Sequence, residues 1–413
     1  MLMTITVVLG VYCVALVTVP LFSRLARRLG AVDRPGFFKV HQREVPLSGG
    51  VGVLVAAAAA ILTRQLLTQE IFTPSVLGFV IGSFVFCGLG LFDDIHRLSV
   101  RVRFWVMTTA AFTAILFLKA PTASLYLLWL WMVVGTFFLV GLSNAVNMLD
   151  GLDGLAAGNI GISLCGLAFL LFSVKETGAA VGALSLAAAW LAFLRYNKPP
   201  AKVFMGSAGS LFAGFALAYL GLSVISAARG AFWGFVSVAF VLWVPLFDAL
   251  GVMLSRFLRG VSIFQKDNYH IHHRLIASGF SRRQTVVFVQ TLSAIGAVCA
   301  VAFVPNSTFP VRLCIPVLFV AVVAVVLLHY RAAKGAKQFL LMRREILTLN
   351  GASLLVSQFK VEERSGAVHI ETYLEKVDGN GGSKTLYRLV SSESGADDVW
   401  QHMLSQAHSM LTA

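Results

Sequence analysis

Charged residues are scarce in this sequence: Asp, Glu, Lys and Arg make up 13% of the 413 residues. A soluble domain has about 25% charged residues and roughly 45–50% apolar ones. Here 58% of the residues are hydrophobic and the mean hydropathy is +0.82. A water-soluble core of this size cannot hide that much apolar surface, so lipid must solvate it. The composition excludes an ordinary soluble enzyme and predicts a protein embedded in a bilayer.

Cysteine is also rare, and its placement excludes two kinds of site. All five cysteines lie inside apolar runs without paired spacing, so neither a disulfide framework nor a zinc site is indicated; they are Cys13, Cys87, Cys165, Cys299 and Cys314. The first apolar run, residues 1–22, lacks a basic start and a small-residue cleavage site. We therefore expect a retained membrane span there and not a signal peptide.

Long apolar runs dominate what is present. At about 1.5 Å per residue, each is long enough or nearly so to cross a bilayer. They predict an all-α polytopic membrane protein with about eleven transmembrane helices, at residues 1–22, 49–66, 75–92, 104–118, 124–142, 156–174, 178–194, 210–227, 231–250, 285–303 and 311–329.

Basic residues separate the loops into two sets. One alternating set, together with the tail, holds 28 of the 33 Lys and Arg, and the opposite set holds five. By the positive-inside rule the first set is cytoplasmic, which places the N-terminus outside and the C-terminus inside. The net charge of +14 then reports membrane topology and contact with anionic lipid heads, not nucleic acid. We expect a membrane protein whose chemistry faces the cytoplasm.

Acidic residues gather on the same predicted side. Of the ten that precede residue 330, only Glu70 and Glu176 belong to the outer loops. Carboxylates at a membrane boundary cost on the order of a few kcal/mol when buried. So many on one face need a counter-charge, and a divalent cation and basic loops are the natural candidates.

Two acidic motifs indicate the chemistry. Asp93 and Asp94 are adjacent, and such a pair repels unless a cation bridges it or one member takes a proton; a solvated loop pair is the alternative reading. In the segment 144–158, oxygen-bearing side chains recur every third residue, so they share one face of a helix end; they are Asn144, Asn147, Asp150 and Asp153. Hard oxygen donors suit Mg²⁺ or Mn²⁺, not zinc.

Three further loops carry weaker signals. Residues 198–210 suggest a tight turn into a helix whose N-terminal amides hold phosphate, although an ordinary cap fits equally well. The first cytoplasmic loop contains Lys39, a candidate phosphate ligand. The loop after the ninth span contains three histidines and an arginine that could bind a metal, contact phosphate or donate protons, namely His270, His272, His273 and Arg274.

Taken together, these motifs resemble the polyprenyl-phosphate N-acetylhexosamine-1-phosphate transferase family. The adjacent aspartates, the segment 144–158, the Phe204–Ser210 turn, Pro245 with Asp248, and the histidine cluster occur in the family's order over roughly residues 1–330. The histidine motif looks more like the branch that uses UDP-N-acetylglucosamine-type donors for O-antigen, common antigen or teichoic acid than the muramoyl-pentapeptide branch. That branch also has eleven spans.

The resemblance implies a reaction. Undecaprenyl phosphate attacks the β-phosphate of a UDP-N-acetylhexosamine, releasing UMP and leaving a lipid diphosphate sugar. It implies Mg²⁺, with Mn²⁺ as an alternative, and it implies that Asn147, Asp150 and Asp153 bind the metal or the nucleotide. Asp93 and Asp94 would orient the lipid phosphate or the metal. Diphosphate contacts would come from Lys39, Arg274 and the histidines, and Asn144 would bind substrate. Direct displacement and a covalent intermediate stay open.

One residue departs from the family pattern. The family usually has an aspartate, regarded as a metal ligand, where this chain has Ser207. A hydroxyl is a neutral, weak ligand, so we expect a lower metal affinity. A natural variant with compensating carboxylates, an inactive relative and a deliberate inactivating change are the competing explanations.

The tail, residues 331–413, differs in composition and holds nine of the nineteen acidic residues. We predict a small cytoplasmic α+β accessory domain: a helix over 331–344, strands near 352–360, 367–376 and 385–390, and an amphipathic helix near 396–411. It would serve as a regulatory, docking or dimerisation module, so a homodimer stays open.

Two rival functions need separate tests. A transporter or channel would usually place charges near mid-membrane or show paired broken helices, whereas these acids lie at one boundary. A catalytically dead scaffold is kept open by Ser207 and the added tail. Release of UMP separates both rivals from a transferase.

Overall fold

The computed structural model describes residues 2–34, 44–68, 72–122, 124–228, 231–258, 270–277, 280–301, 324, 338–349, 352–362, 368–377 and 383–412. The chain divides into two compact units. One comprises Met1–Val32 with Val45–Val326, and the other Asp33–Glu44 with Leu327–Ala413. That each unit has a separate task, as the predicted division at residue 330 implies, stays a prediction.

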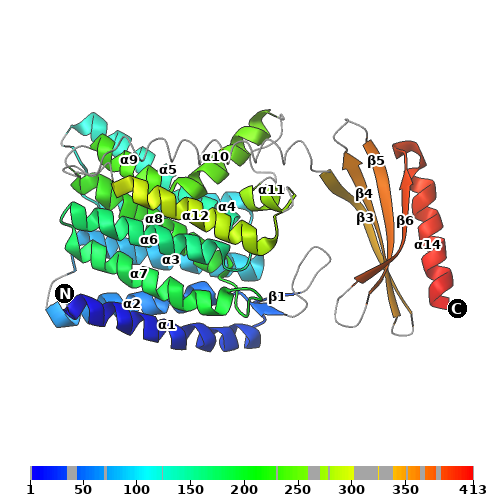
Figure 1. The fold of residues 1–413 in the computed structure, drawn as a ribbon, viewed down its shortest axis with the longest axis horizontal. Helices are drawn as coiled ribbons and strands as arrows, with labels where there is room; N and C mark the ends of the chain where they lie inside the picture. Colours follow the sequence, from blue (N-terminus) through cyan, green and yellow to red (C-terminus); the bar gives the residue numbers. More distant parts are fainter. Residues whose placement is uncertain are drawn as a thin grey trace. The chain divides into compact units, whose positions relative to one another are not determined.

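Helices make up the first unit, apart from two short paired strands, β1 (Val32–Asp33) and β2 (Val45–Pro46) (Figure 1). The helices are α1 (Leu2–Arg28), α2 (Gly49–Thr68), α3 (Pro74–His96), α4 (Val100–Leu116), α5 (Leu125–Leu149), α6 (Leu155–Ser173), α7 (Thr177–Asn197), α8 (Gly206–Ala227), α9 (Ala231–Val241), α10 (Trp243–Leu258), α11 (Ile271–Ala277) and α12 (Arg282–Val301).

Seven of these helices are long and apolar enough to cross a membrane, namely α1, α3, α5, α6, α7, α8 and α12, and α9 with α10 makes an eighth if the bent pair is one span. Helices also occupy the predicted spans 49–66 and 104–118, as α2 and α4. The predicted span 311–329 lies outside the described residues. A multi-span helical protein is therefore supported, while the count of eleven and the orientation stay predictions.

Helix α8 lies at the centre of the bundle. Nearly all of its side chains are buried, and it packs against α2, α3, α5, α6 and α9. Aromatic side chains such as Trp105, Tyr126 and Trp129 are instead exposed on outer helices, where lipid would solvate them. Because α8 is enclosed, its first turn is held rigidly among its neighbours, and that turn forms part of the site described below.

The predicted single span 231–250 is a bent pair. Helices α9 and α10 meet at an angle of 83° around Leu242. Pro245 follows the break, in the first turn of α10, where its missing N–H leaves no intrahelical hydrogen bond unmade. The bend leaves α10 amphipathic: Asp248 and Arg256 are buried, while Phe247, Leu250 and Phe257 are exposed.

The second unit contains a four-stranded antiparallel sheet in the order β3 (Gln338–Leu349), β4 (Ala352–Glu362), β5 (Val368–Val377) and β6 (Ser383–Ser391), followed by a short 3₁₀ helix (Glu393–Gly395) and α14 (Ala396–Thr412) (Figure 1). Trp400, Met403 and Ala407 of α14 pack on alternate residues of the sheet, among them Leu354 and Val356. The last three strands and the final helix confirm the predicted elements.

The predicted helix over 331–344 is wrong for the residues that the structure describes. Residues 338–344 begin β3, which pairs with β4 from Gln338 opposite Glu362 to Leu349 opposite Ala352. Residues 331–337 lie outside the described part. The strand forms because β4 needs a partner on that edge, and its ladder of hydrogen bonds outweighs the modest helix propensity of Leu, Arg and Glu.

Candidate active site

The adjacent aspartates at the end of α3 have different partners. The Asp93 carboxylate accepts a hydrogen bond from the Leu98 amide at 2.9 Å and forms an ion pair with Arg103 at 2.7 Å. Asp94 points elsewhere, because consecutive side chains on a helix diverge by about 100°. Each carboxylate thus receives its own donors from the protein, and Asp93 fixes the turn between α3 and α4.

Asp94 is held by the first turn of α8. Its two oxygens accept hydrogen bonds from the amides of Ser207 at 3.0 Å and Ala208 at 3.3 Å, and the Ser207 hydroxyl lies against the same carboxylate. Gly206 makes this approach possible: its φ is +69°, and a Cβ there would lie 2.5 Å from Asp94 Oδ2.

The N-terminus of α8 is therefore occupied by a carboxylate. The predicted turn into a helix is confirmed, but the expectation that its amides hold phosphate is wrong for Ser207 and Ala208, because Asp94 already takes both. An anion at a helix N-terminus is favoured by the helix dipole and the free amides. Ser207, the position of the family aspartate, thus faces Asp94 directly.

The oxygen-bearing side chains that recur every third residue lie at the end of α5, as predicted. The helix continues through Asn144 and Asn147 to Leu149, and Asp150 is its C-cap. Asn144 donates to the Val140 carbonyl at 2.8 Å, and Asn147 Oδ1 accepts from the Ser210 hydroxyl at 2.7 Å. The Asp150 carboxylate makes no hydrogen bond or ion pair with any residue that the structure describes.

The turn after α5 is anchored from two other helices. Asp153 Oδ2 accepts from the Ala201 amide at 2.9 Å. The next residue, Gly154, donates its amide to Asn197 at 3.0 Å and accepts from the Gln290 amide group at 2.9 Å. Asn197 is buried and also binds the Val203 carbonyl. The Asp150–Asp153 turn is therefore rigid relative to α7 and α12.

The histidine cluster begins with a buried pair. Asp248 of α10 binds His270 Nδ1 at 2.9 Å and the Ile271 amide at 2.7 Å, and both side chains are buried. These contacts fix the start of the short helix α11, which carries His272, His273 and Arg274. Asp248 therefore positions the histidines relative to the membrane bundle.

His272 lies against the turn after α5. A Cβ on Gly151 would lie 2.2 Å from His272 Nε2, so only glycine permits this contact. The ring is 1% exposed, and neither of its nitrogens has a hydrogen-bond partner among the described residues. Burial, followed by the charge of His273, lowers the pKa of His272 to about 3. The ring is neutral at physiological pH and keeps one N–H to donate.

Electrostatics perturb Asp150, the residue that follows the last turn of α5. Burial, followed by the charges of Asp94 and Asp153, raises the pKa of Asp150 to about 7. Asp94 and Asp153 are thus each close enough to Asp150 to repel its carboxylate. A cation placed among them would reverse that repulsion and favour the ionised form of Asp150.

The donor chemistry fits a hard divalent cation, with one limitation. Carboxylate and amide oxygens are the ligands that Mg²⁺ and Mn²⁺ prefer, and Asp150 has no hydrogen-bond or ion-pair partner among the described residues. Within the described ranges, however, no three His, Cys, Asp or Glu side chains are arranged to hold a metal together. Several of the oxygens accept protein hydrogen bonds instead. The carboxylates supply negative charge for a cation, but they do not form a complete coordination shell.

The structure brings together most of the predicted site residues. The ends of α3 and α5, the start of α8 and the helix α11 meet around Gly151, and only Lys39 lies outside the described residues. Sequence reasoning did not find Asn197 and Gln290, and it noted Asp248 without assigning it a role. A lone polar residue inside an apolar run, as at Gln290, is the signal that could have identified it.

Comparison with known proteins identifies the family of this chain. A family profile described as glycosyl transferase family 4 matches residues 76–225. A Bacillus subtilis protein, "Probable undecaprenyl-phosphate N-acetylglucosaminyl 1-phosphate transferase", is 33% identical over 294 residues, covering 69% of this chain and 81% of that protein. This chain belongs to glycosyl transferase family 4.

Two other relatives extend the comparison. The Escherichia coli protein "Undecaprenyl-phosphate alpha-N-acetylglucosaminyl 1-phosphate transferase" is 31% identical, over 66% of this chain and 76% of its own length. The Mycobacterium tuberculosis "Decaprenyl-phosphate N-acetylglucosaminephosphotransferase" is 32% identical, over 70% of this chain and 80% of its own length. The family consists of phospho-sugar transferases, and membership with seven apolar helices identifies a multi-pass membrane enzyme.

Proposed function

We propose that this family 4 enzyme transfers N-acetylhexosamine 1-phosphate, with N-acetylglucosamine as the first candidate sugar, from a UDP-sugar to undecaprenyl phosphate. An oxygen of the lipid phosphate attacks the β-phosphorus, the bond from that phosphorus to the bridging oxygen breaks, and UMP leaves. The product is a lipid diphosphate sugar that starts a cell-envelope glycan. The supporting observation is the contact between His272 and Gly151, which joins the acidic turn to the histidine helix.

Both reactants are anionic, so the site must offset their repulsion. Asp150 and Asp153, with the amide oxygen of Asn147, would hold Mg²⁺ or Mn²⁺. Such an ion would supply charge screening between the two phosphates and would stabilise the leaving UMP. Asp94 would add negative charge beside it, fixed in orientation by α8. Asp93 supports this arrangement through Arg103.

The histidines and the arginine at the start of α11 would bind phosphate oxygens. His272 offers a neutral N–H, and His270, oriented by Asp248, with His273 and Arg274 supplies further donors from the same short helix. We also assign Lys39 and Asn144 to substrate binding, as the family resemblance implies. A lipid phosphate whose second pKa is about 6 is largely ionised at neutral pH, so no general base is required.

The lipid acceptor would approach along α10. Its exposed face carries Phe247, Leu250 and Phe257, whereas its buried face carries Asp248, which holds His270. An isoprenoid chain could lie on the apolar face while its phosphate reaches the histidine helix. We place the site on the cytoplasmic side of the inner membrane, following the distribution of Lys and Arg.

Purified protein incubated with undecaprenyl phosphate, Mg²⁺ and a panel of UDP-N-acetylhexosamines tests the proposal. We expect one UMP for each lipid diphosphate sugar formed. Substrate crossing a vesicle membrane without UMP would instead indicate a transporter. Tight binding of UDP-sugar with no turnover would indicate a scaffold, which the serine at position 207 makes a specific alternative.

A further inference from the structure

Gly154, which directly follows the acidic turn Asp150–Asp153, is held by amide side chains from two other helices. Its N–H donates to Asn197 Oδ1 of α7 at 3.0 Å, and its carbonyl accepts from Gln290 Nε2 of α12 at 2.9 Å. Gly154 is the N-cap of α6, with a φ of +77°. A glycine has no side chain with which to anchor its own position or to cap the helix, so Asn197 and Gln290 supply that anchorage.

Gln290 reaches Gly154 because a second glycine leaves room for it. A Cβ on Gly158, in the first turn of α6, would lie 2.0 Å from Gln290 Nε2. The Gly154 carbonyl also accepts the helical hydrogen bond from the Gly158 amide at 3.1 Å, so Gln290 binds the second lone pair of that oxygen. The Gln290 contact is therefore additional to the hydrogen bonds of α6, and α6 does not require it to form.

Helix α12, which carries Gln290, is itself bound to two other parts of the bundle. The Asn159 amide group of α6 donates to the hydroxyl of Ser293, three residues after Gln290, and both side chains are buried. The Trp243 indole N–H, at the start of α10, donates to the Leu292 carbonyl at 2.9 Å. Because α10 also positions the histidine helix α11, Gln290 connects the acidic turn to a helix that is fixed to the histidine part of the site.

We propose that Gln290 is a positioning residue of the transferase site: through Gly154 it fixes the turn that carries Asp150 and Asp153 relative to the histidine helix. It acts through the backbone, since its amide group binds the Gly154 carbonyl. The inference rests on the proposed function, in which this turn binds a divalent cation. Residues that orient metal ligands without touching the metal typically change metal affinity by about 10–100-fold when they are replaced.

Two variants break this contact in different ways. Gln290→Met keeps the length of the side chain and removes the hydrogen-bond donor. Gly158→Ala keeps Gln290 but adds a methyl group where the amide nitrogen of Gln290 lies. If both variants act on one contact, the double variant should lose no more cation affinity than the stronger single variant, whereas independent effects would add.

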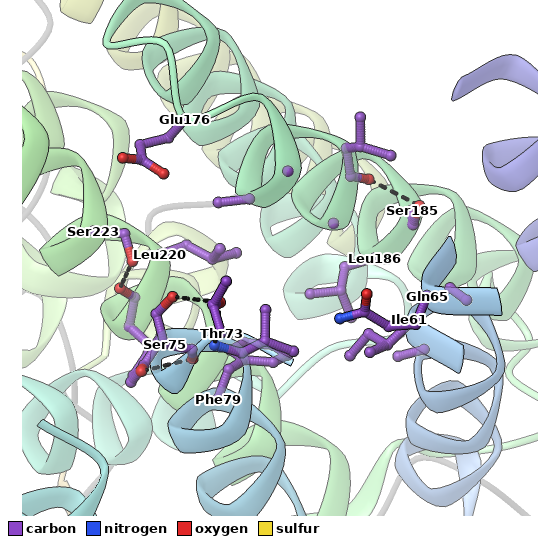
Figure 2. A pocket seen from close by; sticks show the side chains of 18 of the residues that line it. Ile61, Gln65, Thr73, Ser75, Phe79, Glu176, Ser185, Leu186, Leu220 and Ser223 are labelled. Carbon is purple, nitrogen blue, oxygen red and sulfur yellow. Dashed lines mark hydrogen bonds between the residues drawn. The ribbon is translucent and has the colours of Figure 1, made fainter. Parts of the chain in front are cut away.

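Two control variants separate positioning from general packing. Ser293→Ala removes the hydrogen bond to Asn159, which joins the same two helices farther from the acidic turn. Gly182→Ala adds a methyl group to α7 beside a cavity of about 240 Å³ (Figure 2), where a Cβ would meet no atom within 4 Å. That cavity lies at the start of α3 and near the end of α8, whereas Asp94 and Ser207 lie at the other ends of these helices.

The test measures Mn²⁺ binding to the purified full chain by electron paramagnetic resonance, without substrate, together with the thermal unfolding midpoint of each variant. We expect the affinity to fall by about tenfold in Gln290→Met and in Gly158→Ala. In Ser293→Ala and Gly182→Ala it should change by less than about twofold, even where the midpoint of Ser293→Ala is lower. Equal affinity in Gln290→Met and wild type, or an equal loss in Ser293→Ala and Gln290→Met, would overturn the inference.

Asp150→Asn distinguishes failure of this inference from failure of the proposed function. If Asp150→Asn binds Mn²⁺ more weakly than wild type while Gln290→Met binds it equally well, only the role of Gln290 is refuted. If Asp150→Asn binds as wild type does, or if wild type does not bind Mn²⁺, the proposed cation site is refuted and the inference with it. If Gln290→Met does not fold, Gly158→Ala decides, because it keeps Gln290 itself.

Discussion

The pKa of Asp150 makes cation binding dependent on pH. With no cation bound, burial and the charges of Asp94 and Asp153 raise that pKa to about 7, so the carboxyl is protonated below this pH. A cation that binds the ionised form competes with the proton. The ionised fraction falls from about 0.9 at pH 8 to about 0.1 at pH 6, so the apparent affinity should fall by about tenfold over that range.

Binding of Mn²⁺ followed by electron paramagnetic resonance, without substrate, measures this directly, because the phosphates of the substrates then cannot contribute. His272 does not titrate in this window, since its pKa is about 3. The control is Asp150→Asn, which keeps the shape and removes the titrating group. It should bind Mn²⁺ more weakly at pH 8 and show a smaller pH dependence. An unchanged slope in the Asn variant would refute the assignment of this titration to Asp150.

Three further predictions concern Ser207, Gly151 and the tail. Ser207→Asp places a carboxylate beside Asp94, so the Mg²⁺ concentration for half-maximal rate should fall by about tenfold, as expected for one added charged ligand; unchanged Mg²⁺ dependence would contradict this. Gly151→Ala drives His272 away from the turn and should reduce UMP release by about 100-fold, with the thermal unfolding midpoint measured to show that the protein remains folded. Truncation after residue 332 should leave basal transfer intact, and total loss of UMP release in well-folded protein would count against an accessory role for the tail.

The sequence predicted the helical bundle because apolar runs are the strongest signal in a membrane protein. The ends and bends of the helices were harder to predict. The predicted span ends at residue 142, whereas α5 continues to Leu149, and the side chains of Asn144 and Asn147 in its last turns bond the Val140 carbonyl and the Ser210 hydroxyl. The bend between α9 and α10 was also missed, since Pro245 lies in a run that remains apolar on both sides.

The sequence showed which residues belong to the site more readily than it showed which of them contact each other. The acids, amides and histidines of the site stand out in the sequence because they are polar residues at the ends of apolar runs. Which of them pair was not predictable: Asp93 and Asp94 are neighbours in the chain, but one binds Arg103 and the other the start of α8, over one hundred positions away. Such contacts depend on tertiary packing, which periodicity does not encode.

In the tail, too, a contact between distant elements was not predictable from the sequence. Alternation identified β4, β5 and β6, and Leu354 and Val356 of β4 with Leu374 of β5 are buried under α14. Strand β3 contains the basic pair Arg343 and Arg344 beside leucines, a composition that also suits a helix. Its conformation depends on pairing with β4, a neighbour that local propensity does not reveal.

The most direct measurement is UMP release by purified protein given undecaprenyl phosphate, a UDP-N-acetylhexosamine and Mg²⁺, with Asp150→Asn measured in parallel. We predict stoichiometric UMP and lipid diphosphate sugar from wild type, and a rate lower by about 100-fold or more for the Asn variant. Equal rates for the two proteins would contradict a cation-dependent transfer at the end of α5.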